Sequence, residues 1–278
     1  MATAGSKPNL EMERWREWWN KRPGETFDIY ELIRGTPDLL SNQTKMFLTN
    51  KIFSALELRE NDILVDAGCG VGDSTLLLHH HCQKIIGIDH AENLLRLTVQ
   101  RSKSKEIARA LICASISAIP LKDSITDKLI CESVLQYIPE KSLREVMEGF
   151  RRITKDNGIV VICCKNNFTL TEFYHRVMRL LSRVYHYIIT KPTHNSTTKT
   201  AESLIVHYSS YRFYRKLFKE TLGNIEEEWS FALFSWKKLK RFKMNRNIEK
   251  FELWVRQYIP FLLRPFGIEY YFKIRVQK

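Results

Sequence analysis

The chain has 278 residues, of which 44% are hydrophobic and 12% aromatic, enough for one large domain or for a core domain with added segments. This composition excludes disordered and collagen-like chains. No apolar run reaches the roughly 20 residues of a membrane span, and the polar start does not resemble a signal peptide. Six cysteines without a C-x-x-C pair predict a reducing, cytoplasmic location. Four of them lie in apolar runs and are expected to be buried: Cys113, Cys131, Cys163 and Cys164.

The net charge of +13 is unevenly distributed along the chain. Residues 1–165 carry 23 Lys and Arg against 22 Asp and Glu, whereas residues 166–278 carry 21 against 9. A basic cluster within 236–246 alternates with apolar residues, a pattern that fits a membrane surface, an RNA backbone or plain solvent. We therefore expect the C-terminal part to favour an anionic partner, and its kind stays open, as does the oligomeric state.

The predicted elements begin with two helices and continue with apolar strands that alternate with helices. This alternation predicts a parallel sheet covered on both faces. The predicted strands are 63–65, 84–88, 110–114, 127–132, 159–164, 225–234 and 269–276. The predicted helices are 11–21, 42–56, one that starts at Asp73 and Ser74 with those residues as its caps, 91–105, 142–153, 168–189, 209–222 and 236–258.

Residues 63–72 read I-L-V-D-A-G-C-G-V-G, an apolar strand followed by an acidic residue and three alternating glycines. Glycines allow a sharp turn and a close approach of backbone N–H groups to a ligand, and the next helix presents its N-terminus there. Asp89 ends the following strand, where a carboxylate can accept both hydroxyls of a ribose. A dinucleotide site would read G-x-G-x-x-G, so this spacing favours a ligand without a pyrophosphate.

On these residues the sequence resembles class I S-adenosylmethionine-dependent methyltransferases, in particular the type 11 small-molecule group. Residues 63–165 carry the likeness, which includes the segments 119–130 and 132–139 and the Asn157-Gly158 turn. The resemblance implies S-adenosyl-L-methionine as cofactor. It also implies an α/β, Rossmann-like methyltransferase fold: a seven-stranded, mostly parallel sheet with helices on both faces, an added α-helical cap and 269–276 as the antiparallel strand. The cofactor-binding residues it implies are Asp66, Gly68, Cys69, Gly70, Gly72, Asp89, His90, Ser115, Ile116 and Glu132.

Two places depart from the family pattern. Ser115 stands where the family usually has an aspartate against the adenine amino group; serine can accept one hydrogen bond, and Ile116 would add its backbone N–H. Ser133, Gln136 and Tyr137 stand where some members carry two acids and a histidine that bind a metal. We therefore predict no metal site.

The predicted domain order follows from the fold. An N-terminal helical lid (1–41) precedes the cofactor-binding core (42–165), a cap insertion (166–207) follows, and 208–278 return to the core with the basic helix. Aromatic residues at helical spacing in the cap, and Trp15, Trp18 and Trp19 in the lid, fit a roof over an acceptor as well as simple packing.

Methyl transfer from a sulfonium mainly requires alignment of the reacting atoms, and a general base only for a poorly acidic acceptor. His207, where the cap returns to the core, is the candidate base, with a structural histidine as the alternative. Tyr137 is the second catalytic candidate, with packing as its alternative. We expect a small or lipophilic acceptor methylated at oxygen, nitrogen or carbon. An RNA methyltransferase that uses the basic half, acting for example on tRNA, and a non-catalytic scaffold remain the alternatives.

Overall fold

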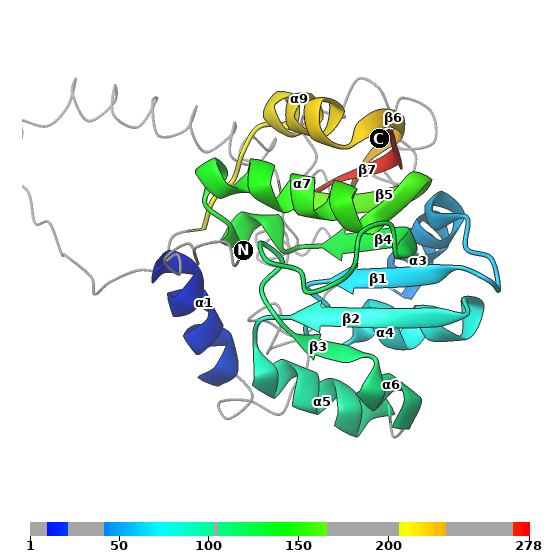
Figure 1. Cartoon of the computed structure of the whole chain (residues 1–278), viewed down its shortest axis with the longest axis vertical. Helices are drawn as coiled ribbons and strands as arrows, with labels where there is room; N and C mark the ends of the chain where they lie inside the picture. The colour runs from blue at the N-terminus through cyan, green and yellow to red at the C-terminus, as the bar shows by residue number, and fades with distance from the viewer. Residues whose placement is uncertain (1–9, 22–41, 103–104, 166–205, 232–268) are drawn as a thin grey trace, which may run out of the picture.

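The computed structural model describes residues 10–21, 42–102, 105–165, 206–231 and 269–278 (Figure 1). These segments form a seven-stranded sheet with helices on both faces, which confirms the predicted fold class. The helices predicted within 168–189 and 236–258, the basic cluster at 236–246 and most of the predicted cap lie outside the described residues.

The predicted elements within the described part of the chain are present, and most differ by a few residues at their ends. The fifth strand starts at Thr154 instead of 159, so it includes the predicted Asn157-Gly158 turn. The helices are α1 (Leu10–Lys21), α3 (Asn42–Leu56), α4 (Asp73–Leu78), α5 (Glu92–Ser102), α6 (Lys105–Arg109), α7 (Leu143–Ile153) and α9 (Tyr211–Thr221), with the one-turn 3₁₀ helices η2 (His79–His81), η3 (Leu135–Tyr137) and η4 (Glu140–Ser142). The strands are β1 (Ile63–Ala67), β2 (Lys84–Asp89), β3 (Leu111–Cys113), β4 (Thr126–Glu132), β5 (Thr154–Lys165), β6 (Gly223–Phe231) and β7 (Glu269–Val276). The separate helix α6 is an addition to the prediction.

The strand order β3-β2-β1-β4-β5-β7-β6 determines where a ligand can enter. Strands β1 to β5 pair in parallel, whereas β7 is antiparallel to both β5 and β6. The chain runs outward from β1 through β2 to β3 and then crosses to the other side of β1 with β4. The strand order therefore reverses between β1 and β4, and ligands of open α/β sheets bind outside the carboxyl ends of the strands at such a point.

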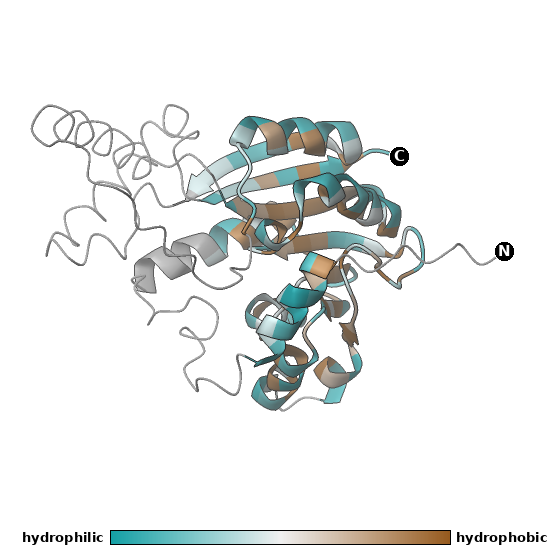
Figure 2. Cartoon of the chain, turned by 90° about the vertical axis from the view of Figure 1, so that its left-hand side faces the viewer, coloured by the Kyte–Doolittle hydropathy of each residue, from teal (hydrophilic) through white to brown (hydrophobic). Residues whose placement is uncertain are grey.

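Two buried clusters hold the helices against the sheet, one on each face. Residues of α7 and α9 pack against alternate residues of the strands, and Phe150, Phe218 and Phe272 are fully buried there. Residues of α3, α4 and α6 cover the other face, where Leu56 and Ile130 are fully buried. Figure 2 shows hydrophobic strands between helices whose outer faces are hydrophilic. Each such side chain contributes about 1.5 to 3 kcal/mol by leaving water.

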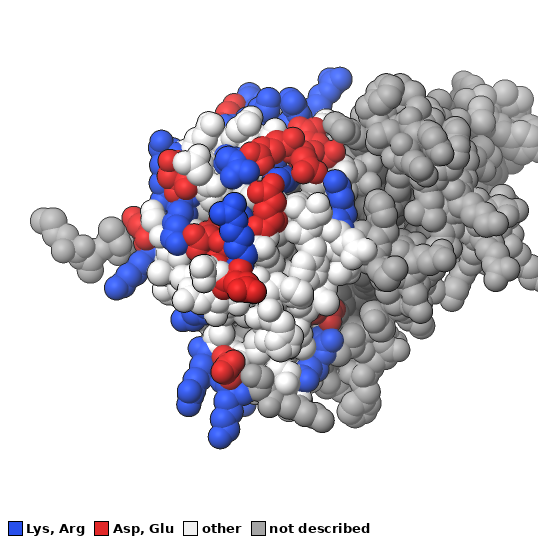
Figure 3. Space-filling model, turned by 90° about the vertical axis from the view of Figure 1, so that its right-hand side faces the viewer, with Lys and Arg blue, Asp and Glu red and all other residues white. Residues whose placement is uncertain are grey.

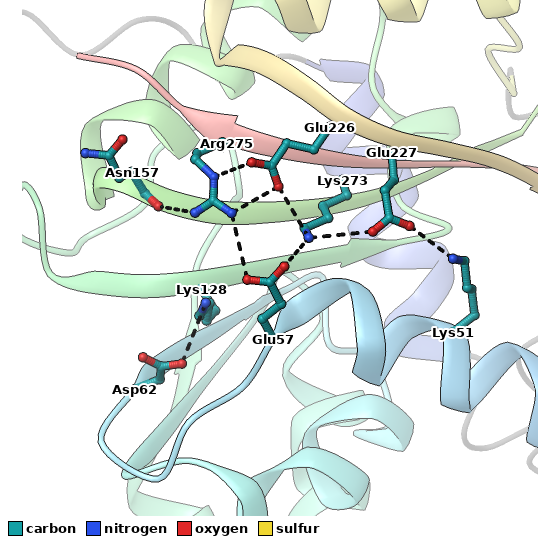
Figure 4. A network of polar contacts seen from close by, with 9 residues as sticks. All are labelled: Lys51, Glu57, Asp62, Lys128, Asn157, Glu226, Glu227, Lys273 and Arg275. Carbon is teal, nitrogen blue, oxygen red and sulfur yellow. Dashed lines mark hydrogen bonds and ion pairs between the residues drawn. The ribbon is translucent and has the colours of Figure 1, made fainter.

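An ion-pair network joins the last strand to the end of α3 at the amino ends of the parallel strands (Figure 4). Lys273 of β7 is only 4% exposed, bonds Glu57, and lies 3.3 Å from Glu226 and 3.6 Å from Glu227. Burial alone would lower the pKa of Lys273, but the hydrogen bonds to Glu57 and Glu226 raise it. Figure 3 shows acidic and basic side chains gathered side by side on one face of the molecule. The network fastens the β6–β7 pair to α3.

The predicted caps of α4 are wrong. Gly72 is the N-cap, in the left-handed conformation with a φ of 78°, and no side chain caps the helix. The Asp73 carboxylate instead pairs with Arg101 at 2.8 Å, and the Ser74 hydroxyl donates to Glu132 at 2.5 Å. Tertiary partners therefore take the two side chains that local preference assigns to the helix end.

The predicted burial of Cys113 is also wrong. Cys113 is exposed because it ends β3, a strand at the edge of the sheet whose backbone pairs with β2 on one side. The other three cysteines of the apolar runs are buried as predicted: Cys131, Cys163 and Cys164.

Candidate active site

The glycine loop crosses the carboxyl end of β2. Gly68, Gly70 and Gly72 all have positive φ, at 81°, 54° and 78°, a backbone region that favours glycine. The backbone N–H groups of Gly68 and Cys69 donate to the carbonyl of Ile88 at 2.7 and 3.0 Å. The turn after β1 is therefore anchored to β2, directly before Asp89.

The three glycines serve different purposes. A Cβ at Gly68 would lie 2.2 Å from the Val134 side chain, and one at Gly72 would lie 2.3 Å from Thr98, so these two glycines allow close packing. A Cβ at Gly70 would meet no atom within 4 Å. The space in front of Gly70 is therefore open, and it lies at the carboxyl end of the sheet.

Asp89 lies directly beside this space. One carboxylate oxygen accepts the N–H of Gly70 at 2.9 Å and the other accepts the N–H of Ala91 at 2.8 Å. Burial raises the pKa of the Asp89 carboxyl, and these backbone hydrogen bonds oppose the rise. Each oxygen has a second acceptor position. Asp89 can therefore hold the loop and accept ligand hydroxyls at the same time.

Asp66, in strand β1, is held by a residue of helix α4. Its carboxylate is 3% exposed and accepts the Thr75 hydroxyl at 2.6 Å. Burial, with the nearby charges of Glu132 and Asp89, outweighs that hydrogen bond and raises the pKa of Asp66 to about 7. The carboxyl groups of Asp66, Asp89 and Glu132 lie around one turn, and their negative charge favours a cationic ligand. The low dielectric constant of this buried place strengthens the attraction. The positive sulfonium and ammonium groups of S-adenosylmethionine fit this charge.

Three further predicted residues line the same edge, in different ways. Burial raises the pKa of the Cys69 thiol well above its usual range, so Cys69 is a packing residue and no nucleophile. Ser115 follows β3, and its hydroxyl lies 2.9 Å from that of Ser117. Ile116 is buried in the cluster beneath α7. Ser115 therefore already shares its hydroxyl with a neighbour, which limits it as an adenine contact.

Helix α1 lies across the carboxyl ends of β1, β2 and β4, beyond their arrowheads in Figure 1. Contact residues recur every four positions on one helix face. Glu11 contacts His207 at 2.5 Å, the Trp15 ring lies 4.6 Å from the Tyr137 ring, and the Trp19 ring lies 5.7 Å from the same tyrosine. The helix thus reaches both catalytic candidates.

The far end of α1 reaches the cofactor loop. Trp19 packs against the cluster that contains Val71 of the glycine loop and Leu94 of α5. The Asn20 side chain accepts the N–H of Asn93, and the Asn93 amide donates to the Asn20 carbonyl. Helix α1 therefore bridges the segment after β4 and the segment after β2.

Two histidine–glutamate pairs anchor this helix. The His90 Nε2 lies 3.4 Å from Glu13, and burial lowers the pKa of His90. His207 pairs with Glu11, and its backbone N–H donates to the Gln136 carbonyl at 2.8 Å, beside Tyr137. The sequence reasoning missed both glutamates, because no local pattern links α1 to residues so distant in the chain.

Residues 65–162 match the family model described as a methyltransferase domain. Over these residues the chain is similar to methyltransferase domains, and the match covers less than half of the chain. Two residues that the resemblance assigns to the cofactor site, Gly70 and Asp89, are joined by a hydrogen bond.

Solved structures share the fold of this chain. Geranyl diphosphate C-methyltransferase from Streptomyces coelicolor is 15% identical, with a TM-score of 0.57 and coverage of 98% of this chain and 100% of that one. Phosphoethanolamine N-methyltransferase 1 from Haemonchus contortus is 12% identical, with a TM-score of 0.60 and coverage of 98% of this chain and 50% of that one.

Curated relatives match a smaller part of the chain. Malonyl-[acyl-carrier protein] O-methyltransferase from Hamiltonella defensa is 24% identical over 98 residues, which are 35% of this chain and 36% of the relative. The chain spans about half or less of the length of the curated relatives it matches. Within the described segments, no helix is long and apolar enough to cross a bilayer. The same segments contain no group of three or more His, Cys, Asp and Glu that could hold a metal ion.

Proposed function

We propose that this chain transfers a methyl group from S-adenosylmethionine to a small-molecule acceptor that binds between the sheet edge and helix α1. The observation that carries the proposal is the open space at Gly70, bordered by the carboxylate of Asp89, whose oxygen accepts the Gly70 N–H. Helix α1 covers the same edge and limits the acceptor to a molecule that fits beneath it.

The donor would be held by the residues around the glycine loop. Asp89 would accept the ribose hydroxyls, and the backbone at Gly68 and Gly70 would leave room for the remaining part of the molecule. The carboxyl groups of Asp66 and Glu132 would stabilise its positive charges. When bound, S-adenosylmethionine supplies a methyl group on an activated sulfonium, so the protein mainly has to orient the acceptor.

His207 would act as the base where the acceptor is a hydroxyl or a protonated amine. Its ring lies on the inner side of α1, and its backbone hydrogen bond to Gln136 fixes it beside the segment that follows β4. Tyr137, which packs between Trp15 and Trp19, would form an apolar wall that excludes water from the acceptor. Two proteins of similar structure bind geranyl diphosphate and phosphoethanolamine, which supports a small acceptor.

The test uses the intact chain and S-adenosylmethionine with a tritiated methyl group. We would incubate both with a cell extract, and then separate small polar molecules, lipids, RNA and protein. We expect label in the small-molecule or lipid fraction, and at least tenfold less label with the Asp89→Asn variant when S-adenosylmethionine is kept below saturation. Label in RNA would favour an RNA methyltransferase. Failure of the wild-type chain to bind S-adenosylmethionine would favour a scaffold.

A further inference from the structure

We propose that Glu11 is the positioning residue for His207, so that helix α1 completes the catalytic site as well as covering it. This inference rests on the proposed function, in which His207 is the base. It assigns a role to a residue that lies 196 positions away in the chain and outside the segment that matches the methyltransferase family model.

The geometry singles out one ring nitrogen. The Nε2 atom of His207 lies 2.5 Å from a Glu11 carboxylate oxygen, and the two side chains are equally half-buried, each 26% exposed. A neutral imidazole has one N–H and one lone pair, and a carboxylate can only accept. The proton therefore sits on Nε2, and the lone pair is on Nδ1.

The same helix holds Glu11 in place through three further contacts. Trp15, one turn later, packs on Tyr137, and Trp19, one more turn along, packs on Tyr137 and the glycine loop. At 1.5 Å per residue, Glu11 and Trp19 are about 12 Å apart along the axis. Helix α1 contacts His207 near its first residues and the cofactor loop near its last residues. It can make both contacts only when it lies across the whole space between them.

The proposed step balances in atoms and charge. A bond forms between the acceptor oxygen or nitrogen and the methyl carbon while the carbon–sulfur bond breaks, and the electron pair of that bond stays on sulfur. Nδ1 of His207 takes the proton that the acceptor loses. The imidazolium that results is stabilised by the Glu11 carboxylate on Nε2. Glu11 touches neither the acceptor nor the methyl donor, and it acts through His207.

A helix latch is the competing explanation, because an ion pair can simply hold α1 closed. Glu13 provides the matched control: it lies on the same helix and pairs with a histidine, His90, at 3.4 Å. If both pairs are latches, removal of either glutamate should have the same effects.

The experiment compares the wild-type chain with Glu11→Ala and Glu13→Ala. The first measurement is a long-range ¹H–¹⁵N NMR spectrum of the protein labelled in its histidines and bound to S-adenosylhomocysteine, with His207→Gln to assign the signals. At pH 9, where an ordinary imidazole is neutral, we expect only the Nε2–H tautomer of His207 in the wild-type chain. We expect Nδ1–H signals to appear in Glu11→Ala and not in Glu13→Ala.

The second measurement separates catalysis from binding. With the extract fraction that the wild-type chain labels as substrate, we expect Glu11→Ala to lower kcat at least tenfold. Its affinity for S-adenosylhomocysteine, measured by calorimetry, should be unchanged. Adding Glu11→Ala to His207→Gln should cause no further loss, because the two residues act as one unit. An unchanged tautomer, or an equal loss of cofactor affinity in both glutamate variants, would overturn the assignment. Wild-type protein that binds no S-adenosylhomocysteine would instead refute the proposed function.

Discussion

Gly70→Ala should separate cofactor binding from folding. The new Cβ would meet no protein atom within 4 Å, so the cost to folding comes from the backbone, whose φ of 54° lies in the left-handed region. An L-residue there costs about 1 to 2 kcal/mol, which lowers Tm by roughly 2 to 4 °C in a chain of this size. If the cofactor fills the space in front of Gly70, the methyl group should lower its affinity by about 1 to 3 kcal/mol, or about 5- to 150-fold.

Differential scanning calorimetry and titration with S-adenosylhomocysteine measure the two effects separately. Gly149→Ala is the matched control, because Gly149 lies within α7 and its Cβ would come no closer than 4.0 Å to any atom beyond its chain neighbours and the backbone of its own helix. We expect this control to gain up to about 1 kcal/mol of stability and to bind normally. Gly68→Ala, whose Cβ would lie 2.2 Å from Val134, should lose more stability than Gly70→Ala. Normal affinity in a folded Gly70→Ala variant would refute the reasoning.

The other predictions concern pH, the ion-pair network and the helix over the site. Asp66 has a folded-state pKa of about 7, above its ordinary value of 3.8, so its contribution to stability is full below pH 4 and is lost as pH rises to 7. The free energy of unfolding of Asp66→Asn, measured by urea denaturation, should therefore depend less on pH and should exceed that of the wild type by up to about 4 kcal/mol at pH 8. Parallel curves of unfolding free energy against pH for the two proteins would contradict this. Lys273→Met should lower the free energy of unfolding by about 2 to 3 kcal/mol in the same assay, because its carboxylate partners are only partly buried. Cofactor affinity should stay normal, and a loss of affinity would show that the ion-pair network and the cofactor site are not independent. Tyr137→Ala removes two ring contacts of about 0.5 to 1.5 kcal/mol each, so hydrogen exchange in residues 10–21 should accelerate at least fivefold; unchanged exchange would show that these contacts do not hold α1.

The sheet and the cofactor loop could be predicted because their signals are local. Parallel strands covered on both faces are apolar where they are buried, as β5 is from Ile159 to Cys164, and such runs are visible without a structure. Positive φ at Gly68, Gly70 and Gly72 requires residues that tolerate it, so the glycine pattern predicted the turn. Parallel pairing of β1 with β2 then brings Asp89 to the same edge.

The partners of α1 could not be predicted, because they depend on tertiary packing. The stretch of three tryptophans indicated a helical lid, but nothing near Glu11 in sequence points to His207. The predicted caps of α4 were wrong for the same reason, because Ser74 donates a hydrogen bond to a residue of β4 that lies 58 positions away. Local preference assigns such side chains to the nearest backbone, whereas the folded chain offers a charged partner with a stronger hydrogen bond.

Calorimetric titration of the wild-type chain and Asp89→Asn with S-adenosylhomocysteine tests the central claim most directly. Asparagine keeps an oxygen that can accept the N–H of Gly70 or Ala91, so the loop should stay folded, whereas an alanine would leave both N–H groups without their acceptor. Hydrogen bonds to a charged group are worth about 1.5 to 3 kcal/mol, so we expect one-to-one binding to the wild-type chain and at least tenfold weaker binding to the variant. Equal affinities, or no binding by the wild-type chain, would contradict a cofactor site built from the glycine loop and Asp89.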